Sequence, residues 1–210
     1  MNTQSIIQLG NHLTLNYRLN ISNLMAELEP HDAKWSQYNT KKLYNHRDGL
    51  CVFNERGVTG PGPALNSLLE WNRDHGTSFT ENEFNKPTEV FNTSMELQQL
   101  LSPIQNYVYR THFLKLHPGG FFPPHRDSFS RTMNSTIRLI VPIMNCQPPH
   151  VRFILEDKTL TWEEGRMYFV NTILMHMLFN ASHQPSTWLV INAECNDCTY
   201  DYITSGLSYI

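Results

Sequence analysis

The chain has 210 residues, of which 40% are hydrophobic and 17% are charged. This length is typical of one sizeable domain, and the composition excludes an intrinsically disordered chain and a collagen-like repeat. The 16 lysine and arginine residues against 19 aspartate and glutamate residues give a net charge of -3, so no overall positive field attracts nucleic acid or an anionic membrane. We therefore expect neither nucleic acid nor a membrane among the partners.

The first half of the chain has mainly helical patterns. Residues 21–29 and 63–75 carry apolar side chains at helical spacing, and a third helix is predicted to end at Leu101, shortly before a proline. A short apolar run at 50–53 is predicted to form a strand. The N-terminal segment lacks a basic start followed by an apolar run, so we expect no signal peptide and a cytoplasmic protein.

After Pro103 the pattern changes to short strands separated by turns. Such spacing predicts a mainly β (α+β) fold, with a double-stranded β-helix or jelly roll of the cupin kind as the closed form. We expect a single domain, 1–210, in which a mixed N-terminal helical extension at 1–105 precedes a jelly-roll core at 106–195 that carries the functional site. The predicted strands are 107–116, 136–143, 151–155, 159–162, 167–171, 176–179 and 188–193.

One group of residues carries candidate metal chemistry. His125 and Asp127 stand two positions apart, so on an extended segment their side chains point to the same face. His176, on another predicted strand, is a candidate third ligand. Two imidazoles and one carboxylate on one face of a metal leave the opposite positions open, which is the arrangement of non-haem Fe(II) oxygenases. The open positions would admit a co-substrate and O2.

Two other motifs are predicted to lie outside a metal site. His46-Arg47-Asp48 repeats the H-x-D pattern, but it follows a polar run, so we interpret it as a loop or strand start that is dispensable for metal binding. Cys195 and Cys198 form a C-x-x-C pair with no second pair and no downstream histidine pair, so we expect plain thiols rather than a zinc site.

The order of several motifs along 107–193 resembles a known family. These motifs are His117-Pro118-Gly119, His125-x-Asp127, Arg138 within an apolar strand, Gly165, His176, Asn180, Ser182 and Leu189-Val190-Ile191. Their order is similar to that of the aspartyl/asparaginyl β-hydroxylase family, which includes free-proline hydroxylases and depends on Fe(II) and 2-oxoglutarate. The resemblance implies a hydroxylase in which His125, Asp127 and His176 bind the iron.

One position departs from the family pattern. Where the family usually has an arginine that pairs with the distal carboxylate of 2-oxoglutarate, this chain has Ser186, and no lysine or arginine occurs after Arg166. A buried carboxylate needs a cationic or hydrogen-bonding partner. Arg138 is the main candidate, because an arginine inside an apolar strand is costly unless it is paired. Period-two spacing places Arg110 and His112 on the face of Leu114, which corresponds to a pocket residue of the family.

The sequence therefore predicts an Fe(II)- and 2-oxoglutarate-dependent dioxygenase that hydroxylates an amino acid, a peptide side chain or a small metabolite. Two alternatives remain open at this point. The chain is a cupin-like metal-binding module without 2-oxoglutarate turnover, or it is a metal enzyme on the same fold with another co-substrate. Formation of succinate from 2-oxoglutarate separates the first reading from both alternatives.

Overall fold

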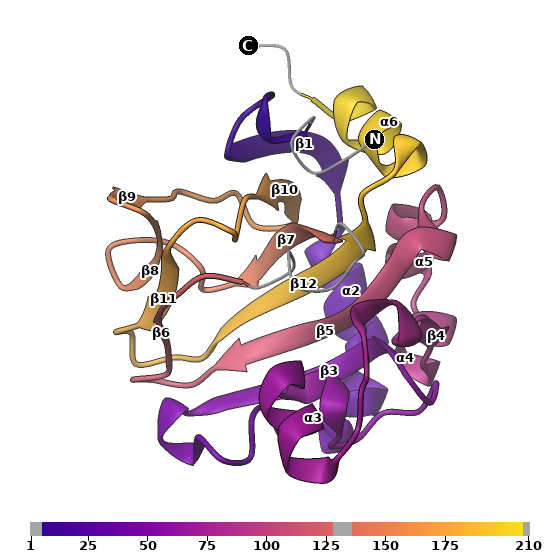
Figure 1. Ribbon diagram of the computed structural model, residues 1–210. Helices are drawn as coiled ribbons and strands as arrows, with labels where there is room; N and C mark the ends of the chain where they lie inside the picture. The colour runs from indigo at the N-terminus through magenta and orange to yellow at the C-terminus, as the bar shows by residue number, and fades with distance from the viewer. Residues whose placement is uncertain (1–5, 128–135, 208–210) are drawn as a thin grey trace.

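A computed structural model describes residues 6–127 and 136–207 of the chain (Figure 1). Within these residues the strands form two antiparallel sheets, one of eight strands and one of four. The large sheet has the order β1-β10-β7-β12-β5-β3-β2, with β4 paired to β3, and the small sheet has the order β6-β11-β8-β9. The strands are β1 (His12–Arg18), β2 (Ser36–Gln37), β3 (Arg47–Asn54), β4 (Lys86–Pro87), β5 (Val108–Leu116), β6 (Phe121–His125), β7 (Thr136–Met144), β8 (Val151–Leu155), β9 (Lys158–Thr159), β10 (Arg166–Val170), β11 (His176–Asn180) and β12 (Ser186–Glu194).

The helices lie in the first half of the chain and at its C-terminal end. They are α2 (Ile21–Leu28), α3 (Leu68–His75), α4 (Glu89–Thr93), α5 (Met95–Leu101) and α6 (Asp197–Ser205). Short 3-10 helices occur at Glu29–Lys34, Leu43–Asn45, Pro63–Leu65, Glu81–Glu83 and Gln105–Tyr107. No helix in the described ranges is both long and apolar enough to cross a membrane.

Both faces of the large sheet are buried, because successive side chains of its central strands alternate between two apolar clusters. On β12, Leu189 and Ile191 belong to the cluster on the helical side, whereas Trp188 and Val190 belong to the cluster that faces the small sheet. The small sheet contributes Phe153 to that second cluster. The two sheets therefore enclose an apolar interior, and helices α2, α4, α5 and α6 cover the opposite face of the large sheet (Figure 1).

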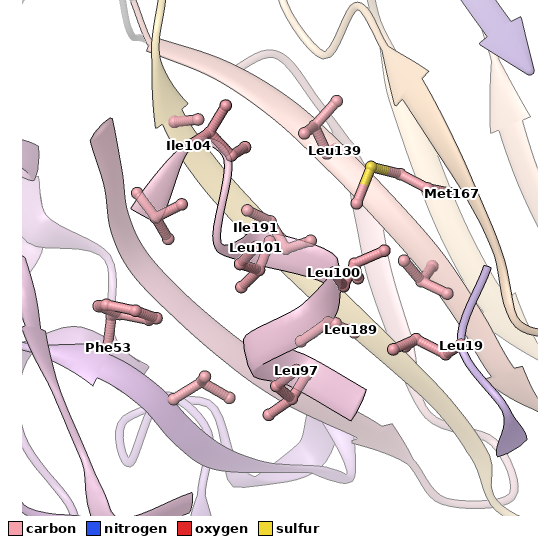
Figure 2. Close-up of a cluster of buried hydrophobic side chains, with 14 of the residues drawn as sticks. Leu19, Phe53, Leu97, Leu100, Leu101, Ile104, Leu139, Met167, Leu189 and Ile191 are labelled. Atoms are coloured by element: carbon pink, nitrogen blue, oxygen red, sulfur yellow. The ribbon is translucent and has the colours of Figure 1, made fainter. Parts of the chain in front are cut away.

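Helix α5 is the central element on the helical side. Ser94 caps it by accepting a hydrogen bond from the Leu97 backbone N–H, which satisfies one otherwise unpaired donor of the first turn. Its Leu97 and Leu101 side chains are completely buried against the sheet, together with Leu139 and Ile191 (Figure 2). This packing fixes the side of the large sheet that points away from the candidate site.

The expected fold class is confirmed, and most of the predicted elements are present. The helix predicted at 63–75 is divided into a 3-10 turn and α3, because Asn66 is extended and Ser67 caps a new helix start. The strands β1, β2, β4 and β6 and helix α6 were not predicted. Residues His12–Arg18 alternate apolar and polar side chains, which is a signal for β1, whereas β6 contains Pro123 and Pro124 and is tolerated because it is an edge strand.

Candidate metal centre and adjoining cleft

His125 and His176 face each other across two neighbouring strands. They are directly opposite in the antiparallel register of β6 and β11, and their ring centroids are 4.2 Å apart. Asp127 follows the end of β6, where its backbone N–H donates a hydrogen bond to the Thr172 carbonyl at 2.9 Å. One ligand atom of each of the three side chains lies within 4.8 Å of the others. Among the described residues, no other cluster of histidine, cysteine and acidic side chains has this arrangement.

The two imidazoles are oriented by backbone carbonyls. His125 Nδ1 lies 2.8 Å from the Pro123 oxygen, and His176 Nδ1 lies 3.0 Å from the Leu174 oxygen. A carbonyl only accepts, so each Nδ1 carries the proton and each Nε2 keeps a lone pair. A metal-binding histidine has this same outer contact, which fixes its tautomer. The Asp127 carboxylate offers an oxygen to the same cluster. The donor set therefore fits a divalent metal such as Fe(II).

Electrostatics favour the protonation states that a metal requires. Burial alone would raise the pKa of the Asp127 carboxyl, but the Arg138 guanidinium and then His176 hold it below its usual value. Arg138 Nη1 lies 2.9 Å from Asp127 Oδ2, and its Nε donates to Asn192 Oδ1 at 3.1 Å. Burial lowers the pKa of His176 to about 4, against an opposing effect of Asp127. Asp127 is thus held as the anionic carboxylate and His176 as the neutral imidazole, which are the states that metal ligands require.

An inner cavity of about 50 Å³ extends from the centre between the sheets. His112 and Arg138 line it, together with His125, His176 and Thr172. Its other walls are Tyr38, Leu114, Phe122, Ile140, Phe153, Leu178, Trp188 and Val190. Burial, followed by the charges of Arg110 and Arg138, lowers the pKa of His112 well below its usual value, so this imidazole is neutral. The inner cavity is therefore mostly apolar, with its cationic group at the metal end.

Ser186 and Arg110 lie in different places from this cavity. The Ser186 hydroxyl is buried and accepts a hydrogen bond from the Trp188 indole N–H at 3.2 Å, and Ser186 is not among the residues that line either cavity. Arg110 forms a buried ion pair with Glu81, with 3.3 Å between Nε and Oε2. Of the four residues predicted to contact the co-substrate, Arg138 and His112 thus line the inner cavity, and Arg110 lines an outer cleft.

An outer cleft with a volume of about 660 Å³ adjoins the same centre. His125, Asp127 and Arg138 form its metal end, and Arg47, Tyr38 and several further side chains come from the first half of the chain. Neither Arg47 nor Tyr38 was predicted from the sequence to lie at the site. Arg47 could have been identified from its place at the start of an apolar strand. Arg138 was identified in the same way, because an arginine in an apolar strand is costly unless it is paired.

The first H-x-D copy is separated from the centre. His46 ends a 3-10 turn with a left-handed backbone (φ 48), and Arg47 is the first residue of β3. Asp48 Oδ2 lies 2.7 Å from His117 Nε2. Neither His46 nor Asp48 belongs to the cluster formed by His125 and its partners. This placement agrees with the loop or strand start expected for the motif. Its dispensability for metal binding stays a prediction.

The chain is similar to one described protein family and to several solved structures. The model of the family described as aspartyl/asparaginyl beta-hydroxylase matches residues 20–195. No curated protein sequence matches the chain significantly. Among solved structures, a prolyl-4-hydroxylase from Pseudomonas putida is 13% identical over 91% of this chain and 96% of the other, with a TM-score of 0.49. A cupin domain from Bordetella pertussis is 20% identical over 43% of this chain and 83% of the other, with a TM-score of 0.32.

Proposed function

Because the chain belongs to the aspartyl/asparaginyl β-hydroxylase family, we propose that it is an Fe(II)- and 2-oxoglutarate-dependent dioxygenase. The observation that supports this most strongly is the convergence of His125, Asp127 and His176, with both imidazoles held in the tautomer that binds a metal. We propose hydroxylation of a free amino acid, a peptide side chain or a small metabolite, with O2 as the oxidant. Nucleic acid and membranes are not part of this proposal.

In the proposed reaction the chain binds and orients the iron and the reactants, and it excludes water from them. The Nε2 atoms of His125 and His176 and the Asp127 carboxylate would hold the iron, which supplies oxidation of a C–H bond coupled to conversion of 2-oxoglutarate to succinate. Arg138 orients Asp127 and is the cation best placed to hold a co-substrate carboxylate, since it borders both the inner cavity and the outer cleft. The apolar walls of the inner cavity keep water away from the reacting groups.

Further co-substrate contacts are proposed for the other predicted residues. The neutral His112 imidazole can donate one hydrogen bond in the inner cavity. Arg110 would act from the outer cleft, although part of its charge is already matched by Glu81. The Ser186 hydroxyl accepts from Trp188, and its O–H can still be donated to a carboxylate oxygen.

The test is succinate formation. Protein supplied with Fe(II), 2-oxoglutarate and O2 is incubated with a panel of amino acids and peptides, and succinate and hydroxylated product are quantified. The proposal expects succinate formation that increases with one class of substrate and disappears in Asp127→Ala. If the folded, iron-loaded protein consumes no 2-oxoglutarate with or without these substrates, the dioxygenase proposal is wrong.

A metal-binding module without 2-oxoglutarate turnover is the second candidate. It is favoured by the inner cavity, whose walls are mostly apolar and whose one arginine, Arg138, already pairs with Asp127. This candidate expects metal binding by the same three ligands and no succinate. Metal titration and succinate formation, measured on one preparation, therefore separate the two functions.

A further inference from the structure

Arg47 is a buried cation that forms no ion pair within the described residues, although the charge of Glu70 acts on it from a distance. It is 3% exposed, and its Nε has no hydrogen-bond partner among the described residues. Its contacts in that part of the chain are aromatic, since the guanidinium carbon lies 3.8 Å from the centre of the Phe122 ring and 5.2 Å from that of Tyr38. Burial lowers the pKa of Arg47, as expected for a cation that water does not solvate fully. An unpaired buried charge is costly, so a function for it must be sought.

The other basic groups of the outer cleft differ from Arg47. Arg110 pairs with Glu81, Arg138 with Asp127, and Lys42 with Glu70 at 2.7 Å. Arg126 is exposed to water. The residues outside the described ranges include no aspartate or glutamate, so they supply no acidic side chain for Arg47.

The cleft as a whole carries an excess of positive charge near the centre. Its walls include five basic side chains and two carboxylates. The basic side chains are those of Lys42, Arg47, Arg110, Arg126 and Arg138, and the carboxylates are those of Glu81 and Asp127. A bound divalent cation would add to this excess. The cleft therefore favours an anionic ligand over a neutral or cationic one.

From these observations we propose that Arg47 binds a carboxylate of the primary substrate. The guanidinium presents a planar fork that matches a carboxylate, and the aromatic contacts hold it in one orientation. Phe122 connects Arg47 to the centre, because its ring contacts the guanidinium and its ring centroid lies 6.0 Å from that of His125. A substrate anchored at Arg47 would thus place a C–H group a few bonds away from its carboxylate at the metal. The placement of the C–H group for oxidation rests on the proposed function, whereas binding of the carboxylate by Arg47 does not.

The co-substrate is the other possible source of a carboxylate. Leu116 on β5 is paired with Arg47 of β3 on one side and with Ser186 of β12 on the other. The three residues therefore lie in one row across the sheet. Paired residues of neighbouring strands share a face. Arg47 lines the outer cleft and not the inner cavity, whereas Tyr38 and Phe122 line both. The Tyr38 and Phe122 rings therefore separate Arg47 from the inner cavity. This separation favours the primary substrate over the co-substrate as the source of the carboxylate.

The test measures binding without iron or 2-oxoglutarate. Proteinogenic L-amino acids and benzoate, each beside its neutral amide, are titrated into the protein by ligand-detected NMR. We expect at least one acid to bind more tightly than its amide. Arg47→Met should weaken the affinity for that acid by roughly tenfold to hundredfold. Arg47→Lys keeps the charge but loses the planar fork, so its affinity for the acid should lie between those of the parent and Arg47→Met. Arg152→Met, which removes an exposed arginine of β8, is the matched control and should bind normally.

Several results would overturn the inference. One is that no acid binds better than its amide, and another is that Arg47→Met binds the acid as well as the parent does. A third is a raised Michaelis constant for 2-oxoglutarate in Arg47→Met with unchanged binding of the acid, which would assign the residue to the co-substrate. A purely structural role predicts a lower melting temperature for Arg47→Met, whereas removal of an unpaired buried cation predicts an equal or higher one. Loss of succinate formation with intact acid binding would refute the proposed function alone.

Discussion

His112 is a buried histidine whose surroundings oppose a positive charge. It is 3% exposed, and its Nδ1 has no hydrogen-bond partner in the described part of the chain. Burial is the largest cause of its lowered pKa, and the nearby arginines Arg110 and Arg138 act in the same direction. In the unfolded chain the same imidazole titrates near its ordinary value of about 6.5. The folded and unfolded states therefore bind different numbers of protons in mildly acidic solution.

This difference predicts how stability depends on pH. Because the folded pKa of His112 is lower than the unfolded one, its contribution to stability is present above pH of about 6.5 and is lost as the pH falls towards the folded value. One proton corresponds to about 1.4 kcal/mol per pH unit. Urea unfolding of metal-free protein between pH 7 and 5 should therefore show a smaller loss of stability in His112→Gln than in the parent. Equal slopes would contradict this account, and His150→Gln, at an exposed position, is the control.

Arg138 is expected to affect the co-substrate as well as Asp127. A hydrogen bond to a charged group contributes roughly 1.5–3 kcal/mol, so Arg138→Ala should raise the apparent Michaelis constant for 2-oxoglutarate by tens of fold or more. Arg138→Lys should give a smaller increase, because it retains a charge. The assays are run at saturating Fe(II), because loss of the ion pair between Arg138 and Asp127 can also change the affinity for iron. Unchanged constants in both variants would remove Arg138 from co-substrate binding.

At the scale of elements, α5 is the helix whose packing is most directly testable. Leu101 is fully buried in the cluster between this helix and the large sheet, whereas Met95 on the same helix is 57% exposed. Leu101→Ala should lower the free energy of unfolding by about 2–5 kcal/mol, through lost burial and the cavity left behind. Met95→Ala should change it far less. Chemical denaturation measures both, and a small effect of Leu101→Ala would contradict this packing.

The sequence predicted those elements whose signals are local. Strand β8 was predicted with its observed bounds, and the ligand residues followed from the short H-x-D motif and one further histidine. Strand β6 was not predicted, because Pro123 and Pro124 lack the N–H groups that a central strand needs. Its stability as an edge strand comes from β11, which lies some fifty residues away in the chain.

The environment of individual side chains was harder to predict than the strands. Arg47 looked like part of a polar loop because its neighbours in sequence are polar, and its burial depends on Phe122, which is distant in sequence. In the same way, the contact between Ser186 and Trp188 depends on a rotamer and not on spacing. Residue spacing predicts which side chains share a face, but the partner of each polar group is fixed by tertiary packing.

For the molecule as a whole, the first half of the chain does more than support the jelly roll. Its strand β3 continues the large sheet beside β5, and its residues Tyr38 and Arg47 form one side of the outer cleft. The candidate metal ligands come from the second half, on β6, β11 and the residue after β6. The proposed active site therefore lies where both halves meet, and the family match over 20–195 spans both of them.

Metal binding by individual ligand variants is the most direct test of the proposed centre. Titration of metal-free protein with Fe(II) under anaerobic conditions should give a single tight site that is lost in His125→Ala, Asp127→Ala and His176→Ala. Circular dichroism and urea unfolding confirm that each variant remains folded. The control variants His46→Ala and Asp48→Ala, from the other H-x-D copy, should bind iron as the parent does. Loss of iron in His46→Ala, or its full retention in the three ligand variants, would contradict the account.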